Sequence, residues 1–388
     1  MPEFADYYQQ IYAKGMGGEQ PALPVMVADL EQRALEAMEP RAASYVCAGA
    51  GSEDTMRANR DAFRRWRIVP RMLRDVAERD LATSVLGTEM AAPVMLAPIG
   101  VQKIVHPEGE LASAAAAAAL GLPYVASTAS AYSLEQIAEQ AGEGPRWYQL
   151  YWPGDDAIAG SMVERAERAG YAAIVLTVDT FIPGWKPRDL QQAWLPFLEG
   201  TGNANFFEDP VFRAGLERPP EEDMGAAIGH YIEVYPNPRL TWDKVEWLRG
   251  QTSLPILVKG ILHPDDAREA VGRGLDGVVV SNHGGRQIDG EIASLDALPA
   301  IVEAVGDEIV ILLDSGIRGG ADVIKALALG ADAVLLGRPY LWGLALDGRD
   351  GVETVLRMLL AELDLTMALS GYTTIDQLGR EALSREPT

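Results

Sequence analysis

The stretch IVILLDSGIRGGADVIKALALGADAVLLGR, residues 309–338, decides the fold. It holds an apolar run at 309–313, a glycine-rich loop, an amphipathic helical segment and a second apolar run at 333–336. Runs that are apolar on both faces are typical of parallel strands covered by helices, and a helix between two strands is the crossover that parallel pairing needs. The stretch therefore predicts a strand–helix–strand unit of a parallel sheet.

The same pattern recurs upstream, from residue 92 onward. Six further apolar runs precede a loop and a helical segment, at residues 93–97, 124–127, 147–150, 173–178, 256–259 and 277–281. Eight units at nearly regular spacing predict a closed (β/α)₈ TIM barrel, with a doubly wound open sheet as the competing fold.

Two segments fall outside this repeat. Residues 1–75 show helical patterning, so we expect a helical extension packed on a barrel formed by residues 76–388. Residues 181–239, between the fourth and fifth strands, are rich in proline, glycine, asparagine and aromatic residues and have weak periodicity. A long irregular insertion after a barrel strand lies at the C-terminal face, where we expect it to act as an active-site lid. A disordered or oligomer-contact loop is the alternative.

The composition excludes several classes of protein. The chain has 388 residues, of which 48% are hydrophobic and 23% charged, which is ordinary for a soluble globular protein and unlike disordered, collagen-like or coiled-coil chains. A net charge of -23 repels a phosphate backbone, so we expect no nucleic-acid partner. Cys47 is the only cysteine, and no metal-binding motif is present, so we expect neither an intrachain disulfide nor a metal centre.

The sequence indicates a cytoplasmic protein without a membrane partner. The first residues, MPEFADYYQQ, carry charges where a signal peptide needs an apolar run. Residues 111–134 are uncharged, but they are mostly alanine and serine and are interrupted by Gly121 and Pro123, which argues against a membrane span.

Polar residues gather where the predicted strands end. In a barrel these ends converge on one mouth, and side chains two residues apart in a strand share a face. The residues concerned are Ser127, Gln149, Tyr151, Thr177, Asp179, Lys259, Ser281, His283 and Asp314. We expect them to form one cluster.

His283 is the candidate base. It follows an apolar strand directly and lies in a glycine-rich turn, SNHGGRQ at 281–287. A neutral imidazole accepts a proton near pH 7, and a carboxylate such as Asp179 would orient it and stabilise its charged form. Arg286 carries a planar fork that suits a carboxylate. The alternatives are a structural histidine and a solvated arginine.

Lys259 and two glycine–arginine loops suggest sites for anions. Lys259 ends the fifth strand, where it could neutralise an anion formed in a reaction, or could simply pair with Asp314. The loops after the seventh and eighth strands, DSGIRGG at 314–320 and GRP at 337–339, lie where phosphate often binds in these barrels. Ordinary turns are the alternative.

These motifs together resemble a known family. SNHGGRQ at 281–287, DSGIR at 314–318, TVDT at 177–180 and LAPIGV at 96–101 are similar to those of the FMN-dependent L-2-hydroxy acid oxidases, over nearly the whole chain. Within that family the sequence most resembles bacterial lactate 2-monooxygenases.

The resemblance implies a set of site residues. The implied FMN contacts are Pro98, Ile99, Gly100, Ser127, Gln149, Thr177, Lys259, Ser281, Asp314, Gly316, Arg318, Gly337 and Arg338. The implied substrate contacts are Tyr45, Tyr151, His283 and Arg286, with Asp179 behind the histidine.

The resemblance also implies a reaction. His283 would remove the hydroxyl proton of a small L-2-hydroxy acid, with L-lactate as the expected substrate, while hydride passes to the flavin, which oxygen reoxidises. Lys259 would stabilise negative charge on the reduced flavin. If the 2-oxo acid leaves first, the products are the 2-oxo acid and hydrogen peroxide, whereas if it stays, the peroxide decarboxylates it oxidatively to acetate, carbon dioxide and water. The long insertion and Gly100, where many oxidases carry alanine, resemble the monooxygenase; relatives form homo-tetramers or homo-octamers.

The sequence departs from the family pattern at two positions. Lys186 lies where the family has an arginine after the fourth strand, with Arg188 two residues on, and either could supply the second cation for the substrate carboxylate. Ala129 stands where glycolate oxidase has a tryptophan, which could leave room for a larger substrate side chain.

Two other functions compete with this hypothesis. The first is another FMN barrel, either an isomerase or a dehydrogenase that uses a quinone or a cytochrome as acceptor. The second is a flavin-binding barrel without turnover, against which the joint presence of His283 and Arg286 counts.

Overall fold

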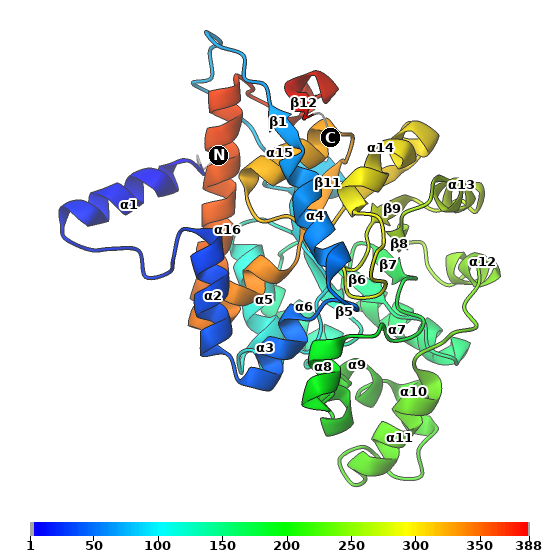
Figure 1. Cartoon of the computed structure of the whole chain (residues 1–388). Helices are drawn as coiled ribbons and strands as arrows, with labels where there is room; N and C mark the ends of the chain where they lie inside the picture. The colour runs from blue at the N-terminus through cyan, green and yellow to red at the C-terminus, as the bar shows by residue number, and fades with distance from the viewer. Residues whose placement is uncertain (1–3, 387–388) are drawn as a thin grey trace.

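Eight parallel strands close into a barrel in the computed structural model, which describes residues 4–386 (Figure 1). The strands follow chain order around the barrel, and β11 pairs with β4 to close it. They are β4 (Val94–Leu96), β5 (Tyr124–Ser127), β6 (Arg146–Leu150), β7 (Ile174–Thr177), β8 (Ile256–Ile261), β9 (Gly277–Val280), β10 (Val310–Leu313) and β11 (Ala333–Leu336). The predicted TIM barrel is confirmed, and each strand falls on one of the eight predicted runs.

The barrel interior is a packed layer to which every strand contributes one side chain. These residues are all buried: Met95, Val125, Trp147, Val175, Leu257, Val279, Leu312 and Leu335. Trp147 donates a hydrogen bond from Nε1 to Thr88 Oγ1 at 2.9 Å. Thr88 belongs to the hairpin of β2 (Thr83–Val85) and β3 (Thr88–Met90), which therefore covers the N-terminal end of the barrel.

Helices surround the barrel and bury their apolar faces against it. They are α5 (Gly109–Ala119), α6 (Leu134–Ala141), α7 (Asp156–Arg168), α12 (Asp243–Arg249), α13 (Pro264–Gly272), α14 (Ser294–Val305), α15 (Gly320–Ala328) and α16 (Arg338–Ser370), the last of which is kinked at Asp347 and Gly348. Short 3₁₀ turns lie at η1 (Gln102–Ile104), η3 (Ile375–Gln377) and η4 (Arg380–Ala382). Within residues 4–386, none of the helices combines the length and the apolar character that a bilayer crossing requires.

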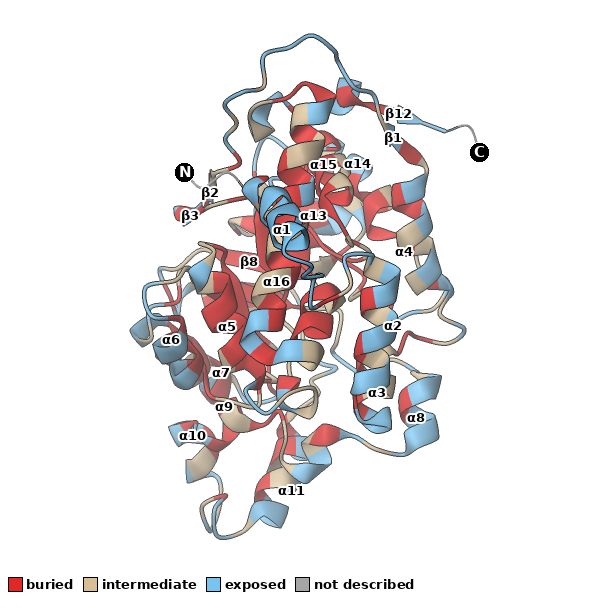
Figure 2. Ribbon diagram, turned by 90° about the vertical axis from the view of Figure 1, so that its left-hand side faces the viewer, coloured by how far each residue is buried: buried red, intermediate tan, exposed pale blue. Residues whose placement is uncertain are grey.

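The N-terminal segment is helical up to Arg64 and then forms a strand. Its helices are α1 (Asp6–Met16), α2 (Val27–Ala37), α3 (Pro40–Cys47) and α4 (Asp54–Arg64). Figure 2 shows α1 largely exposed, whereas α2 packs against α16. The strand β1 (Trp66–Ile68) pairs antiparallel with β12 (Leu383–Arg385), so the two ends of the barrel sequence meet in a small sheet. Helical periodicity could not predict this pairing.

The insertion after β7 is more helical than its sequence pattern predicts. It contains α8 (Pro187–Gln192), η2 (Pro196–Glu199), α9 (Ala204–Phe207), α10 (Pro210–Ala214) and α11 (Met224–Val234), which project from the barrel as a group (Figure 1). Most of these helices are too short to show a periodic pattern. Aromatic contacts among Phe206, Phe212 and Tyr231 hold the group together.

A buried amide is one of the contacts that anchor the insertion to the barrel. Asn205 donates from Nδ2 to the carbonyl oxygens of Ser127 and Thr128, both at 3.1 Å, and accepts from Leu134 N at 2.8 Å. These bonds fix α9 on the loop that follows β5. The inner part of the insertion is therefore continuous with the wall of the barrel mouth.

Candidate functional site

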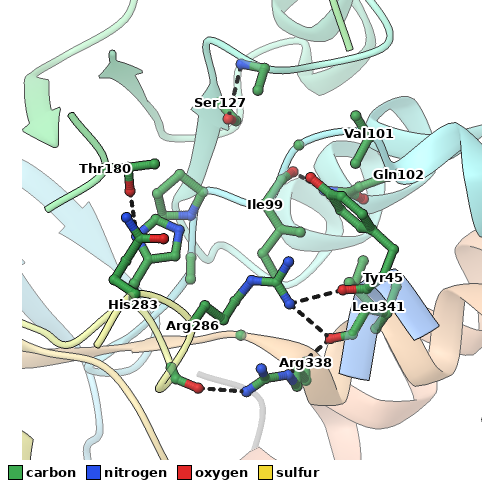
Figure 3. Close-up of a pocket in the computed structure, with 18 of the residues that line it drawn as sticks. Tyr45, Ile99, Val101, Gln102, Ser127, Thr180, His283, Arg286, Arg338 and Leu341 are labelled. Atoms are coloured by element: carbon green, nitrogen blue, oxygen red, sulfur yellow. Dashed lines mark hydrogen bonds between the residues drawn. The ribbon is translucent and has the colours of Figure 1, made fainter. Parts of the chain in front are cut away.

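A cavity of about 440 Å³ opens at the C-terminal ends of the barrel strands. Figure 3 shows side chains from several strand-end loops, from α3 and from α16 converging on it. The insertion supplies mostly apolar lining residues, among them Leu195, Phe197 and Tyr231. A largely apolar cavity with a few converging polar groups is typical of a small-molecule site.

The floor of this cavity is formed by part of the next layer of the barrel interior, through Ala97, Ser127, Lys259, Asp314 and Gly337. Side chains alternate along each strand, so the residues two positions beyond the apolar layer point to the same axis. They are Ala97, Ser127, Gln149, Thr177, Lys259, Ser281, Asp314 and Gly337. The predicted cluster of strand-end polar residues thus exists because each strand has the same period.

His283 and Asp179 form a hydrogen-bonded pair beside the cavity. His283 Nδ1 lies 2.8 Å from Asp179 Oδ1, and Thr180 Oγ1 donates to the same carboxylate oxygen at 2.7 Å. We assign the Nδ1 proton to this bond, which leaves Nε2 as the acceptor; Tyr151 Oη lies 3.5 Å from it. The imidazole that lines the cavity is therefore oriented by a carboxylate.

The charges of this pair suit a base. Burial lowers the pKa of His283 below 6.5, and the Asp179 carboxylate offsets only part of that effect. Burial opposes ionisation of Asp179, yet His283 and Lys259 together hold its pKa well below the ordinary value of 3.8. At neutral pH the histidine is thus a free base beside a permanent carboxylate, which would stabilise the imidazolium once a proton is taken up.

The backbone at His283 is strained. Its φ of 56° lies in the left-handed region, as do those of Val101 (51°) and Ser315 (74°), and His283 and Val101 both line the cavity. Such a conformation costs of order 1–3 kcal/mol for a residue other than glycine. Ser315 helps to hold the turn, since its Oγ accepts from Gly284 N at 2.9 Å. The strain aims the imidazole at the cavity instead of along the strand.

Lys259 forms a buried ion pair with Asp314, which the sequence analysis gave as the alternative to a functional role. Its Nζ lies 3.3 Å from Asp314 Oδ2 and 3.8 Å from Asp179 Oδ2, and donates to Ser281 Oγ at 3.0 Å. Burial alone would lower the pKa of Lys259, but the two carboxylates reverse this and leave it raised. The lysine also lines the cavity floor, so a fixed positive charge is present there.

Arg286 lies across the cavity, next to Tyr45. Its Nη1 donates to the carbonyl oxygens of Tyr45 at 2.8 Å and Ala48 at 2.9 Å, and its guanidinium lies over the Tyr45 ring (Figure 3). Within residues 4–386, the hydrogen bonds that Arg286 donates to backbone carbonyls all come from Nη1, so Nε and Nη2 form an edge that can bind a carboxylate.

Two further arginines, Arg318 and Arg338, line the cavity from the loops after β10 and β11. Burial, Arg286 and Arg318 lower the pKa of Arg338 to about 9, and burial, together with Arg60, lowers the pKa of Arg318 to about 10. Within the described residues 4–386, neither guanidinium forms an ion pair. Crowded, desolvated cations of this kind favour the binding of an anion between the two loops.

A family model described as FMN-dependent dehydrogenase matches residues 34–385 of this chain. The chain belongs to that family. The resemblance found in the sequence motifs is thereby confirmed, and the cofactor of the family is FMN.

Individual relatives agree with this assignment. The chain is 46% identical over 359 residues to a protein named L-lactate oxidase from Lysinibacillus sphaericus, covering 92% of both chains. It is 42% identical to human 2-hydroxyacid oxidase 1, covering 94% of this chain and 97% of that one. The crystal structure of mandelate oxidase superposes with a TM-score of 0.83 at 40% identity, covering 94% of this chain and 98% of that chain.

The residues around the cavity fit the cofactor FMN. Gln149 Nε2 and Thr177 Oγ1 are buried and have no hydrogen-bond partner within residues 4–386, and each lies across a strand pair from a lining residue, Ser127 and Lys259 respectively. Polar edges of a flavin ring would satisfy these groups. The crowded Arg318 and Arg338 would hold its phosphate. Of the other predicted FMN contacts, Pro98, Ile99, Gly100, Asp314, Gly316 and Gly337 line the cavity, while Ser281 lies behind Lys259.

The structure separates Lys186 from Arg188. Lys186 lines the cavity, whereas Arg188, on α8, forms a two-pronged ion pair with Glu53 at 2.6 and 2.7 Å and is not among the lining residues. We therefore take Lys186 as the candidate second cation. Burial and Arg286 lower the pKa of Lys186 to about 8, and Asp189 offsets only part of this shift.

This pKa predicts an alkaline limit to substrate capture. Below about pH 8 Lys186 is charged and attracts a substrate carboxylate; above it the charge is lost, so kcat/KM should fall by about 10–100-fold to a plateau that Arg286 alone sustains. In Lys186→Arg the charge persists, and the decline should be absent from a steady-state profile between pH 7 and about 10. An unchanged decline in the arginine variant would contradict this role for Lys186.

The glycine at position 100 is explained by the close packing of two loops. A Cβ at this position would lie 2.3 Å from the carbonyl oxygen of Ala129, since Val101 N also bonds that oxygen at 2.9 Å and holds the two loops in contact. The glycine is therefore required by loop packing, whatever becomes of the product. Its resemblance to the monooxygenase residue does not by itself distinguish the two reactions.

The contact gives a direct prediction. Gly100→Ala must displace backbone and should lower the free energy of unfolding by about 1–3 kcal/mol in a denaturant titration. The matched control is Gly229→Ala on α11, where an added Cβ meets nothing within 4 Å and alanine should be neutral or stabilise by up to about 1 kcal/mol. Equal stability of the two variants would contradict this prediction, because it would show that the two loops can move apart at little cost in free energy.

Some site residues were not predicted. Thr180 and Ser315, whose hydroxyl groups donate to the carboxylates of Asp179 and Asp314, lie three and two residues beyond their strands, so their positions near the strand ends were a usable signal. Asn205 carries no such signal, because its partners Ser127 and Thr128 are far away in the sequence.

Proposed function

We propose that this protein oxidises a small L-2-hydroxy acid with FMN and oxygen, that His283 is the base, and that L-lactate is its substrate. The observation that carries the proposal is the His283–Asp179 pair at 2.8 Å, facing a cavity that Arg286 and Lys186 also line. A base and two cations around one cavity are the groups that a 2-hydroxy acid needs. The names of the relatives, L-lactate oxidase and 2-hydroxyacid oxidase 1, support the same chemistry.

The side chains have separate tasks in this reaction. Arg286 and Lys186 bind the substrate carboxylate, and Tyr45 and Tyr151 lie beside them to position the hydroxyl end. This holds the hydroxyl proton toward His283 Nε2, which takes it as a general base.

The remaining charges stabilise the state that follows. Asp179 balances the imidazolium through its bond to Nδ1, and Lys259 provides positive charge at the barrel axis, where negative charge then develops. FMN, when bound, supplies the hydride acceptor and the reaction with oxygen.

The second part of the proposal concerns the product. We propose that the 2-oxo acid stays in the site and is decarboxylated, so that L-lactate and O₂ give acetate, CO₂ and water. The insertion supports this because Leu195, Phe197 and Tyr231 line the cavity and Asn205 anchors α9 to the β5 loop, which would slow departure of the product. In this proposal residues 181–239 act as a lid.

Aerobic turnover of L-lactate tests both parts. Acetate, pyruvate and hydrogen peroxide are quantified together, with D-lactate as the control for handedness. Predominant acetate supports the monooxygenase reaction. Pyruvate with an equal amount of peroxide would support simple oxidation and contradict the proposed decarboxylation. Anaerobic flavin bleaching without oxygen consumption in air would point to another electron acceptor, and the absence of bleaching with every 2-hydroxy acid tried would overturn the function.

A further inference from the structure

Glu110 is a buried acid that the proposed chemistry does not use. It lies in the first turn of α5, a helix that Figure 2 shows buried over most of its length, and its own side chain is fully buried. A fully buried carboxyl group is uncommon unless its oxygens are engaged. Its position outside the strands therefore calls for a structural or functional reason.

One oxygen of Glu110 joins two loops of the barrel mouth. Oε1 accepts hydrogen bonds from the backbone N–H groups of Gln102 and Ala131, both at 3.0 Å. Gln102 belongs to the segment after β4, and Ala131 to the segment after β5. At the same junction Val101 N donates to the carbonyl oxygen of Ala129 at 2.9 Å. The carboxylate thus fastens the two loops next to each other.

Gln102 continues the connection toward the cavity. Its Nε2 donates to the carbonyl oxygen of Ile99 at 2.8 Å and to the hydroxyl of Tyr124 at 3.0 Å, and its Oε1 accepts from Ser113 at 2.7 Å. Tyr340 Oη donates to the carbonyl oxygen of Ala97 at 2.9 Å. The segment 97–102 is therefore held from behind, while its other side lines the cavity, where Figure 3 shows Ile99 and Gln102.

We infer that Glu110 is a positioning residue, which sets the loops after β4 and β5 at the distance that the flavin site needs. It acts through Gln102 and Ala131 and does not itself reach the cavity. The effect on flavin chemistry rests on the proposed function, but the effect on the two loops does not. Burial raises the pKa of Glu110 to about 7 although both N–H donors and Lys103 favour its ionised form, so experiments at pH 8 examine the carboxylate.

Two substitutions at Glu110 distinguish the effect of its hydrogen bonds to the loops from the effect of its charge. Glu110→Ala removes the acceptor of both N–H groups. Glu110→Gln keeps Oε1 in place and loses only the charge, while its amide nitrogen would replace Oε2, which has no hydrogen-bond partner within residues 4–386. A positioning role predicts that the alanine variant is impaired and that the glutamine variant restores most of what is lost.

The first measurement is hydrogen exchange on the FMN-loaded protein. In Glu110→Ala the amides of Gln102 and Ala131 should exchange at least about tenfold faster, and in Glu110→Gln they should stay close to wild type. The second measurement is of the bound cofactor: the alanine variant should show a shifted visible flavin spectrum and bind FMN more weakly. The third is anaerobic reduction by L-lactate, in which the rate constant at saturation should fall by about 10–100-fold while substrate Kd changes little.

Asp364→Asn is the matched control. Asp364 is also a buried acid and also ties distant segments, because it accepts from Ala5 N at 2.9 Å and pairs with Arg79, but none of these residues lines the cavity. This variant should lose stability without changing the flavin spectrum or the reduction rate.

The outcomes decide between the inference and the function. Unchanged exchange at Gln102 and Ala131 in Glu110→Ala overturns the inference, as does a glutamine variant impaired as severely as alanine. Faster exchange with an unchanged spectrum, FMN affinity and reduction rate overturns it too, because the loops would then not position the flavin. If wild type is not reduced by any 2-hydroxy acid, the proposed function fails, while exchange, spectrum and FMN affinity still decide the role of Glu110.

Discussion

His283→Ala should leave a yellow protein whose flavin is reduced about 10²–10⁴-fold more slowly by L-lactate, because the hydroxyl proton loses its acceptor. Stopped-flow reduction under anaerobic conditions measures this step alone, apart from oxygen chemistry and product release. The FMN spectrum should stay close to wild type, whereas the denaturation midpoint should fall, because Asp179 loses its hydrogen-bond partner and alanine disfavours the φ of 56°.

His283→Asn provides the control for backbone strain. The native φ of 56° is unfavourable for alanine, whereas asparagine tolerates the left-handed region. Both variants should show the same slow reduction if the missing base is the cause. Near-normal reduction in either one would refute the assignment of His283.

Arg286→Ala should raise the Kd of L-lactate by about 30–1000-fold, which is the range expected when one partner of a buried charge-assisted pair is removed. Rapid-mixing reduction at several lactate concentrations gives this Kd directly. The reduction rate at saturation should fall less than in the His283 variants, because the base remains in place.

A neutral substrate distinguishes carboxylate binding from a general disturbance. Arg286 also holds the carbonyl groups of Tyr45 and Ala48, so its removal could loosen the wall. With L-lactamide, which has no carboxylate, wild type and Arg286→Ala should differ by less than about threefold if the charge is what matters. Free guanidinium should restore part of the lactate binding. An equal loss with both substrates would show that Arg286 acts through the wall alone.

The barrel could be predicted from the sequence because its signal is local and repeated. Every strand is apolar on both faces and is followed by a helix, so neighbouring residues carry the pattern. The β1–β12 pair could not be predicted in this way, because Trp66 meets Arg385, at the other end of the chain. The short helices of the insertion were missed for a different reason, since they depend on tertiary contacts, such as the packing of Phe206 against Phe212 and Tyr231 and the hydrogen bonds of Asn205.

Part of the candidate site could be predicted from the alternation of side-chain direction along each strand, which repeats every two residues. This alternation predicted that the polar residues at the strand ends form one cluster, but it could not show which of them line the cavity. The choice between Lys186 and Arg188 depended on Glu53, which captures Arg188 from another part of the chain. Glu110 gave no signal, because an acid in the first turn of a helix is usually an ordinary surface residue.

The end of α3 holds arginine side chains of the cavity in place, although it lies far from the first barrel strand in the sequence. The carbonyl groups of Val46 and Ala48 accept hydrogen bonds from both Arg286 and Arg338, and that of Tyr45 accepts one from Arg286. An engineer who trimmed the chain down to its strands and their crossover helices would strip these acceptors away and leave two guanidinium groups facing each other without them. A minimal version of this protein therefore has to begin upstream of residue 45, however complete the remaining barrel looks.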